Sequence, residues 1–230
     1  MYDPLIIVQA RCSSKRLKNK VLMSVKGTPL IVYLIERLRS FTENNNIIIA
    51  TSDHATDDPL TEICKKHDIL YFRGSLQNVA MRFRDVIKKY DPDTFIRISG
   101  DSPLIDQKII KELYKEYINH NPDICTNVFP NRTFPKGQSV EIIKSKIFLN
   151  SFKHFSKQDH LEHVTKYFYE NSKDYNILSV NANSANEELN LSVDEPEDFE
   201  FVSSILKKMK HKHIDYDLEQ IIKIINEKNL

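Results

Sequence analysis

The sequence predicts an α/β protein built on a doubly wound, mostly parallel β-sheet. Short runs of β-branched and other apolar residues alternate with amphipathic helical patterns, at the spacing of βαβ units. Polar loops rich in Ser, Asp and Arg follow the predicted strands, which is where ligands bind in sheets of this kind. A chain of 230 residues with 40% hydrophobic and 28% charged residues is long enough for one domain with a complete core. We therefore expect a single domain.

The first half of the chain shows the alternation clearly. Strands are expected at Leu5–Val8, Ile47–Ala50, Ile69–Phe72 and Thr94–Ile98. Helices are expected over residues 29–41, 58–67, 76–90 and 107–119. In the third helix, Val79, Phe83, Val86 and Ile87 recur at helical spacing and are expected to pack on the sheet.

The second half of the chain is less regular. Residues 122–185 contain two extended pieces, SVEIIK and YNILSV, and a helical pattern near 159–171. The alternation returns with a strand at LNLSV, residues 189–193, and a helix from Glu197 to about Lys210. The tail, residues 211–230, is expected to form one amphipathic helix. The pattern thus predicts a small insertion, at about 122–185, before the last strand of the core sheet.

Composition excludes several classes of protein. A formal net charge of +1 argues against bulk attraction to nucleic acid or anionic membranes. No segment resembles a signal peptide, and the longest apolar run, 30–35, is far too short for a membrane-spanning helix. The three cysteines, Cys12, Cys64 and Cys125, make neither a disulfide framework nor a zinc pattern. We expect a cytoplasmic protein that neither inserts into membranes nor binds nucleic acid.

Positive charge is concentrated in one loop, which follows the first predicted strand. The stretch VQARCSSKRLKNKVL, residues 8–22, contains Arg11, Lys15, Arg16, Lys18 and Lys20. Backbone amides near a helix start, together with Arg and Lys side chains, favour binding of a polyphosphate. The glycine-rich patterns of the P-loop and of the dinucleotide-binding fold are absent. The alternative is a solvated basic loop.

Two aspartates are candidate metal ligands because each follows a predicted strand. They are Asp101 in RISGDSPLID and Asp194 in LSVDEPEDFE. Carboxylates presented at strand ends bind hard cations such as Mg²⁺, and two strands that are neighbours in the sheet would let both bind one ion. Without metal, mutual repulsion would raise the pKa of one of them. The alternative is that each aspartate only caps the following helix.

The predicted insertion holds a further group of polar residues. They lie in FPKGQSVEI and EHVTKY, and could bind a polar substrate: Lys136, Gln138, Glu141, His163 and Thr165. For His163 the plainer alternative is an ordinary surface or core histidine.

Taken together, these stretches resemble the cytidylyltransferase family typified by the spore coat polysaccharide biosynthesis protein SpsF, whose relatives activate sialic acid and 3-deoxy-manno-octulosonate as CMP-sugars. IIVQARCSSKRLKNKVL resembles the opening family motif I-I-Q-A-R-M-G-S-T-R-L-P-G-K-V-L. Further stretches match the family in the right order, and together with the opening motif they span about 200 residues. They are ATSDHATDDPL, FRGS with Asn78 and Arg82, RISGDSPLID, RTFPKGQSVEI, EHVTKY and VDEPEDFE.

The resemblance implies the nucleotide-diphospho-sugar transferase (GT-A-like) version of the fold and a set of site residues. It implies that Arg11, Ser14 and Lys20 hold the triphosphate of CTP, with Ala10 and Arg16 beside them. It also implies that Ser52, Arg73 and Ser75 face the base and ribose, and that Asp101 and Asp194 carry Mg²⁺. Of these, Arg11, Lys20, Asp101 and Asp194 are the expected catalytic residues. The resemblance further implies a homodimer, formed through the predicted insertion.

The function expected from this resemblance is transfer of CMP from CTP to a sugar acid or a phosphorylated small molecule, with release of pyrophosphate. The chain departs from the family motif at Ser139 and Lys166, which bears on the acceptor and not on the nucleotide. Three alternatives stay open: another nucleoside triphosphate used on a sugar phosphate, an NDP-sugar glycosyltransferase, and a non-catalytic binding homologue. The Asp-x-Asp motif of such a glycosyltransferase is matched only by Asp91-Pro92-Asp93, which precedes its strand.

Overall fold

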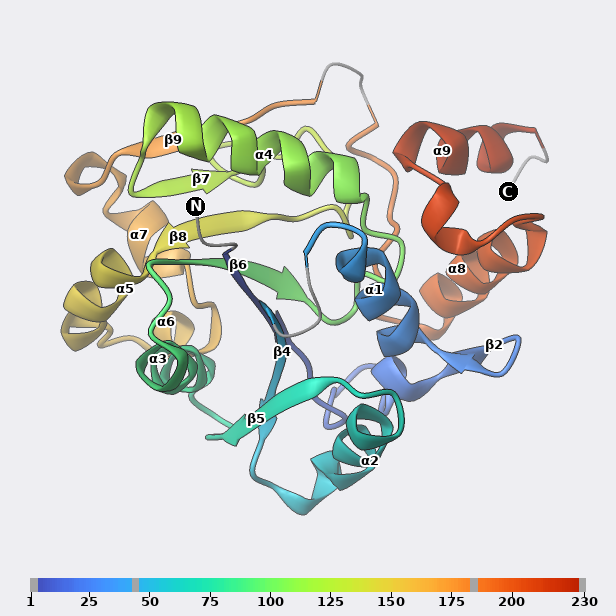
Figure 1. Ribbon diagram of the computed structural model, residues 1–230, viewed down its shortest axis with the longest axis horizontal. Helices are drawn as coiled ribbons and strands as arrows, with labels where there is room; N and C mark the ends of the chain where they lie inside the picture. Colours follow the sequence, from blue (N-terminus) through green and yellow to red (C-terminus); the bar gives the residue numbers. More distant parts are fainter. Residues whose placement is uncertain (1–3, 43–45, 183–185, 228–230) are drawn as a thin grey trace.

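A seven-stranded sheet forms the centre of the molecule (Figure 1). The computed structural model describes residues 4–42, 46–182 and 186–227. The strand order across the sheet is β5-β4-β1-β6-β8-β7-β9. The strands are β1 (Leu5–Gln9), β4 (Ile47–Ser52), β5 (Leu70–Gly74), β6 (Thr94–Ser99), β7 (Ile124–Thr126), β8 (Glu141–Lys144) and β9 (Ile177–Ser179). A separate hairpin pairs β2 (Ser24–Val25) with β3 (Thr28–Pro29).

The pairing confirms a mostly parallel sheet. β5, β4, β1 and β6 run parallel, whereas β8 is antiparallel to both of its neighbours, β6 and β7, and β9 is parallel to β7. The carboxyl ends of β1 and β6 are adjacent, since Gln9 is in register with Ser99. The segment predicted as an insertion supplies β7, β8 and β9, so it widens the sheet as well as carrying helices. Residues 183–185 of that segment lie outside the described residues.

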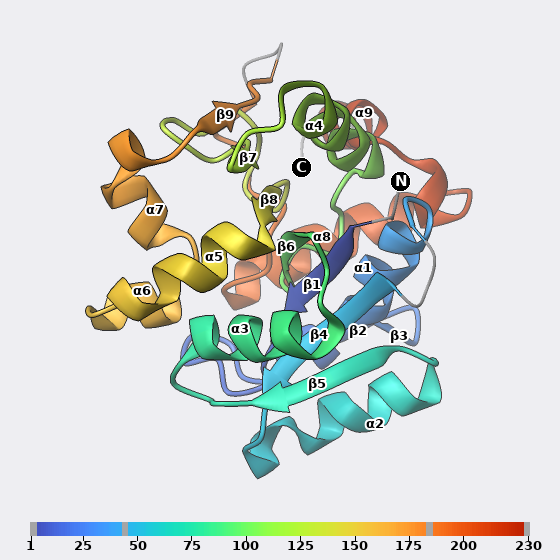
Figure 2. The same cartoon turned by 60° about the vertical axis from the view of Figure 1, so that its left-hand side comes forward.

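Helices cover both faces of the sheet, as the alternation predicts. One face packs on α1, α2 and α4 through apolar side chains such as Leu34, Leu60 and Leu113. The other packs on α3 and on the helices of the second half, through Phe83, Phe148 and others (Figure 2). The helices of these layers are α1 (Leu30–Arg39), α2 (Asp58–Lys66), α3 (Val79–Tyr90), α4 (Gln107–His120), α5 (Ser145–Ser151), α6 (Gln158–Glu162) and α7 (Lys166–Glu170).

A third apolar cluster lies outside α1, where α8 (Pro196–Lys208) and α9 (Leu218–Asn226) pack together. Arg37 of α1 ties this layer to the core, because its guanidinium donates to the carbonyl oxygens of Ile105, His213 and Tyr216. Short 3-10 helices complete the chain: η1 (Lys20–Leu22), η3 (Ala55–Asp57), η4 (Phe152–His154), η5 (Ser172–Asp174) and η6 (His213–Asp215). In the described residues, every helix is too short or too polar to span a lipid bilayer.

Three elements differ from the sequence predictions. LNLSV forms no strand and makes a single bridge, between Asn190 and Lys136, because Gly137 turns the partner segment away directly afterwards. The helix expected near 159–171 is broken into α6 and α7 at His163, whose backbone leaves the helical region. The expected tail helix is only α9, preceded by η6, and residues 228–230 of that prediction lie outside the described residues.

Candidate active site

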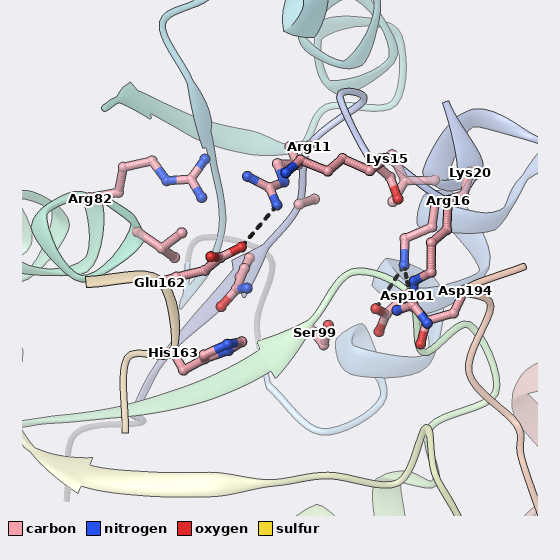
Figure 3. A pocket seen from close by; sticks show the side chains of 15 residues that line it. Arg11, Lys15, Arg16, Lys20, Arg82, Ser99, Asp101, Glu162, His163 and Asp194 are labelled. Carbon is pink, nitrogen blue, oxygen red and sulfur yellow. Dashed lines mark hydrogen bonds and ion pairs between the residues drawn. The ribbon is translucent and has the colours of Figure 1, made fainter. Parts of the chain in front are cut away.

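A polar cavity of about 310 Å³ opens beyond the carboxyl ends of β1 and β6 (Figure 3). It is lined by the loop that follows β1, by the turn after β6, by α3 and by the end of α6. The lining residues are Gln9, Ala10, Arg11, Ser14, Lys15, Arg16, Lys20, Val21, Val79, Arg82, Ser99, Asp101, Glu162, His163 and Asp194. Five of them are cations and three are carboxylates, so the cavity carries an excess of positive charge and is suited to a polyanion.

The basic loop is held in place by a buried carboxylate that the sequence analysis did not single out. Asp57, fully buried, accepts hydrogen bonds from the backbone N–H of Cys12 at 2.7 Å and from Ser52 N–H at 3.0 Å. The hydroxyl groups of Thr51 and Ser52 donate to the same carboxylate, at 2.9 and 2.5 Å. Burial alone would raise the pKa of Asp57, but these hydrogen bonds lower it below its ordinary value. Asp57 therefore fastens the loop after β1 to the end of β4.

Lys20 joins the two predicted metal ligands. Its Nζ lies 3.0 Å from Asp101 Oδ2 and 2.8 Å from Asp194 Oδ1. The backbone holds the two aspartates together as well, since Val193 N–H donates to the carbonyl oxygen of Asp101 at 2.8 Å. Burial favours a raised pKa for Asp194, but the hydrogen bond and charge of Lys20, with the charge of Arg16, outweigh it and lower the pKa. The expected rise in pKa is thus wrong for Asp194, because Lys20 supplies the compensating charge.

Neither aspartate is a helix cap. The N-cap of α4 is Asp106, whose side chain accepts from Lys108 N–H at 2.8 Å. At α8 the cap is Glu195, which forms a capping box with Asp198. The capping alternative for Asp101 and Asp194 is therefore removed, and both carboxylates face the cavity.

Two arginines of the loop form ion pairs across the cavity. Arg16, mostly exposed, lies 2.9 Å from Asp194 and 3.6 Å from Glu195. Arg11 lies 3.3 Å from Glu162, at the end of α6. Pairs this exposed are weak and readily exchanged for a ligand anion.

Arg82 is a further arginine of the cavity, and the sequence analysis gave it no role. It projects from α3 toward the cavity and is only 1% exposed (Figure 3). Its Nε and Nη1 have no hydrogen-bond partner in the described part of the chain. Burial, with a smaller contribution from the charge of Arg11, lowers the pKa of Arg82 to about 10, so the side chain stays charged at neutral pH.

The residues expected at the base and ribose lie outside the cavity lining. Each guanidinium nitrogen of Arg73 already has a partner in the protein. Nε and Nη2 donate to the carbonyl oxygens of Ser52 and His54, each at 2.9 Å, and Nη1 pairs with Asp58 at 2.7 Å. The Ser52 hydroxyl is bonded to Asp57, and the Ser75 hydroxyl accepts from the backbone N–H of Asn78 at 3.1 Å. The structure brings these three together at the ends of β4 and β5, beside the cavity.

Two of the five residues expected to bind the acceptor, Gln138 and Glu141, instead make buried hydrogen bonds within the protein. Gln138, fully buried, accepts from Asp106 N–H at 2.8 Å and donates to the carbonyl oxygen of Leu104 at 2.9 Å. Glu141, 2% exposed, pairs with Arg97 and accepts from the hydroxyl of Tyr169 at 2.5 Å.

Of the other three expected acceptor residues, His163 lines the cavity, and Thr165 and Lys136 are outside its lining. Thr165 is buried and its hydroxyl bonds to Glu141, which helps to lower the pKa of that carboxyl. Lys136 is exposed, and its charge helps to lower the pKa of Asp194. His163 is exposed and lines the cavity itself.

Comparison with known proteins places this geometry in a family. A sequence model of the cytidylyltransferase family matches residues 5–228. The chain belongs to the cytidylyltransferase family. Protein MJ1063 of Methanocaldococcus jannaschii, itself uncharacterized, is 30% identical over 96% of this chain and 89% of its own length. The spore coat polysaccharide biosynthesis protein SpsF of Bacillus subtilis is 29% identical over 98% of this chain and 95% of its own.

Solved structures of cytidylyltransferases share the fold. A cytidylyltransferase from Leptospira borgpetersenii has a TM-score of 0.92 at 27% identity, over 98% of this chain and 94% of its own. A CMP:2-keto-3-deoxy-manno-octonic acid synthetase, solved in complex with CTP, has a TM-score of 0.68 over 90% of this chain and 99% of its own. At 16% identity this second likeness concerns the fold alone. The nucleotidyltransferase fold expected from the sequence is confirmed.

Proposed function

We propose that this cytidylyltransferase transfers CMP from CTP to a sugar acid or a phosphorylated small molecule, and that the product serves synthesis of a polysaccharide or glycoconjugate. The observation that carries the proposal is the cavity at the ends of β1 and β6. There a loop with four cationic side chains faces two carboxylates that lie close enough to share one lysine. This combination of charges suits a nucleoside triphosphate better than a neutral ligand.

In the proposed reaction an oxygen of the acceptor forms a bond to the α-phosphorus of CTP, and the bond from that phosphorus to the bridging oxygen of the pyrophosphate breaks. An acceptor hydroxyl loses its proton to solvent water in this step, whereas the attacking oxygen of an ionised phosphate monoester carries no proton. Arg11, Lys15 and Arg16 would neutralise the triphosphate, with the hydroxyl and backbone of Ser14 and Ala10 beside it. The ammonium group of Lys20 donates two hydrogen bonds to carboxylates, and its third N–H can donate to a phosphate oxygen.

Mg²⁺ fits the carboxylate pair and is proposed as the cofactor. Mg²⁺ in proteins is commonly bound by one or two carboxylates, and water and phosphate oxygens complete its octahedron. Asp101 and Asp194 supply that number, and the described residues contain no cluster of three or more His, Cys, Asp or Glu that would suit an all-protein metal site. When bound, the ion would neutralise charge on the departing pyrophosphate.

The acceptor is proposed to enter between His163 and the end of β6. Gln9 and Ser99 line this side of the cavity, and the amide oxygen of Gln9 accepts from Arg97 Nε at 3.3 Å. Arg97 in turn pairs with the buried Glu141. On this side His163 is exposed and is open to an anionic acceptor. The exposed Lys136 acts on Asp194, at the other side of the cavity.

Two further expectations complete the proposal. We propose a homodimer formed through residues 122–182, which light scattering at micromolar concentration tests; a monomer would contradict it. We also propose a cytoplasmic location, which is supported by three cysteines that are buried and free.

The experiment that tests the function measures pyrophosphate release with Mg²⁺ from CTP, UTP, GTP and ATP across a panel of sugar acids and phosphorylated sugars. We expect release from CTP with at least one acceptor of these classes. Equal or faster release from another nucleotide would contradict the assignment of CTP. Release from none of the four with any acceptor would favour a non-catalytic homologue.

A further inference from the structure

Arg82 differs from the other buried arginine of this protein. Arg37 is equally buried, but its guanidinium is satisfied by three carbonyl oxygens. Arg82 instead leaves Nε and Nη1 without partners, although a buried donor left unpaired costs about 1–3 kcal/mol. Arg82 also lines the cavity, so a guanidinium with two unpaired donors lies at its wall. No protein group among the described residues bonds these two donors, so a ligand or a water molecule has to complete the bonding of Arg82.

The fold makes room for this side chain. A Cβ added at Gly74, in the FRGS loop, would lie 3.1 Å from Arg82 Cγ and 3.3 Å from a ring carbon of Phe72. These contacts are tighter than ordinary van der Waals packing, so the absent side chain at Gly74 leaves space for the stem of Arg82. The loop and the helix thus place an unpaired guanidinium where the cavity reaches α3.

The cavity has two chemically different ends (Figure 3). Lys20, Arg16, Asp101 and Asp194 gather at one end, and Arg82 lies well away from them, near Glu162 and His163. Val79, three residues before Arg82 on α3, also lines the cavity. An extended nucleotide with its triphosphate at the first end would therefore carry its base toward the second.

We infer that Arg82 reads the base of the bound nucleotide, by donating to the adjacent O2 and N3 acceptors of cytosine, and so selects CTP over UTP. This inference rests on the proposed function and adds to it the residue that discriminates between nucleotides. On the Watson–Crick edge of cytosine, O2 and N3 accept and the N4 amino group donates, whereas N3 of uracil carries a proton. A guanidinium therefore bonds both O2 and N3 of cytosine, and in uracil it meets a second donor.

Glu162 argues for a base rather than an anion at this end. Its carboxylate lines the same part of the cavity and pairs with Arg11 at 3.3 Å. The amino group of cytosine can donate to this carboxylate, whereas an ionised phosphate or carboxylate has no N–H or O–H to donate to it. The order of donor and acceptor groups along the base is thus matched by one guanidinium and one carboxylate.

The test measures dissociation constants for CTP, UTP and inorganic pyrophosphate, with Mg²⁺, by titration calorimetry. The variants are Arg82→Lys, which keeps the charge and loses the two-pronged edge, and Arg82→Met, which removes both. Arg84→Lys and Arg84→Met are the matched controls, because Arg84 lies on the same helix and pairs with Asp85 outside the cavity. We expect wild type to bind CTP about tenfold or more tightly than UTP. That ratio should fall toward one in both Arg82 variants, while pyrophosphate binding and both controls stay as in wild type.

A change in the ligand tests the same contact in the unaltered protein. Replacing N3 of the base by C–H, as in 3-deazacytidine triphosphate, should weaken binding to wild type about as much as uracil does, and should have little effect in the Arg82 variants. Equal affinity of wild type for CTP and UTP, or an unchanged ratio in the variants, would overturn the inference. A parallel loss of CTP and pyrophosphate affinity would also overturn it, by making Arg82 a phosphate ligand. Each of these outcomes is independent of whether pyrophosphate is released, which tests the proposed function itself.

Discussion

Lys20 is the residue on which the arrangement of charges in the cavity depends most. It is 9% exposed, follows Asn19, whose positive φ turns the chain inward, and reaches both Asp101 and Asp194. A lysine placed between two carboxylates offsets their mutual repulsion and so lets them lie close together. The same ammonium group can then interact with the triphosphate.

Replacing Lys20 by alanine should therefore weaken nucleotide binding or turnover by about tenfold or more, since a charged hydrogen bond contributes about 1.5–3 kcal/mol. Lys18→Ala is the control, because Lys18 lies in the same loop but is exposed and outside the cavity lining. Titration of CTP into both variants checks this prediction. Unchanged affinity and rate in Lys20→Ala would mean that the loop is only solvated surface.

Sequence reasoning found the basic loop and both aspartates but missed Arg82 and Asp57. A signal for Arg82 is present: Val79, Arg82, Phe83 and Val86 share one helical face, so an arginine stands within the buried stripe of α3. Asp57 carries no comparable signal. It lies in the acidic stretch SDHATDD, and only the tertiary fold shows which of its carboxylates accepts four hydrogen bonds.

At the scale of elements, the segment 189–193 shows why alternation alone overpredicts strands. Leu191 and Val193 are buried against α8, and Asn190 and Ser192 bond to each other, which gives the period-2 pattern of a strand. Its backbone forms one β-bridge, with Lys136, through hydrogen bonds of 3.0 and 2.9 Å, and the Val193 N–H bonds to the carbonyl oxygen of Asp101 at 2.8 Å. The extended segment matters because it carries Asp194 to the cavity.

Gly137 fixes the position of that segment. Its φ is +87°, and an added Cβ would lie 2.6–2.7 Å from the backbone of Leu191 and Ser192. Gly137→Ala should displace residues 191–194, and should lower both the free energy of unfolding, by about 1–3 kcal/mol, and the rate of pyrophosphate release. Gly27→Ala is the matched control, since Gly27 also has positive φ, at +79°, but has no atom within 4 Å of the added Cβ. If the two variants lose activity equally, backbone strain alone accounts for the effect.

At the scale of the whole molecule, the parallel half of the sheet was predictable because each strand is a continuous apolar run bounded by polar loops. In the other half, the extended pieces SVEIIK and YNILSV were expected and form β8 and β9. Their place in the sheet and the strand β7 were not predictable, because β7 and β9 have three residues each and pair with strands distant in sequence. The cavity lies where the first half meets α6 from the second. Its position therefore required the tertiary structure.

Buried carboxylates should make the stability of the molecule fall in acid. Burial favours raised pKa values for Asp57, Glu141 and Asp194, but all three values are lowered. Hydrogen bonds outweigh burial at Asp57, and hydrogen bonds together with positive charge outweigh it at Glu141 and Asp194. A carboxyl group whose pKa is lower in the folded than in the unfolded protein stabilises the fold fully at pH values above its unfolded-state pKa, about 4. This stabilisation is lost as the pH falls through the folded-state pKa. Burial lowers the pKa of His213, so the free energy of unfolding should fall somewhat as the pH drops below about 6.5. Urea unfolding should then show a further decline below about pH 4. Asp57→Asn should reduce this decline; an identical decline in that variant would contradict the assignment.

The most direct test of the whole account concerns Asp101 and Asp194, and combines kcat for pyrophosphate release from CTP with the melting temperature. Asp101→Asn and Asp194→Asn should each lower kcat by about a hundredfold or more and weaken the Mg²⁺ dependence of CTP binding, with Tm near that of wild type. Asp106→Asn is the control, because the Asp106 carboxylate accepts hydrogen bonds from the backbone N–H groups of Lys108 and Leu218. This variant should lose about 1 kcal/mol of stability, or a few degrees of Tm, and should keep the kcat of wild type. Retained kcat and Mg²⁺ dependence in the Asp101 and Asp194 variants would contradict the account.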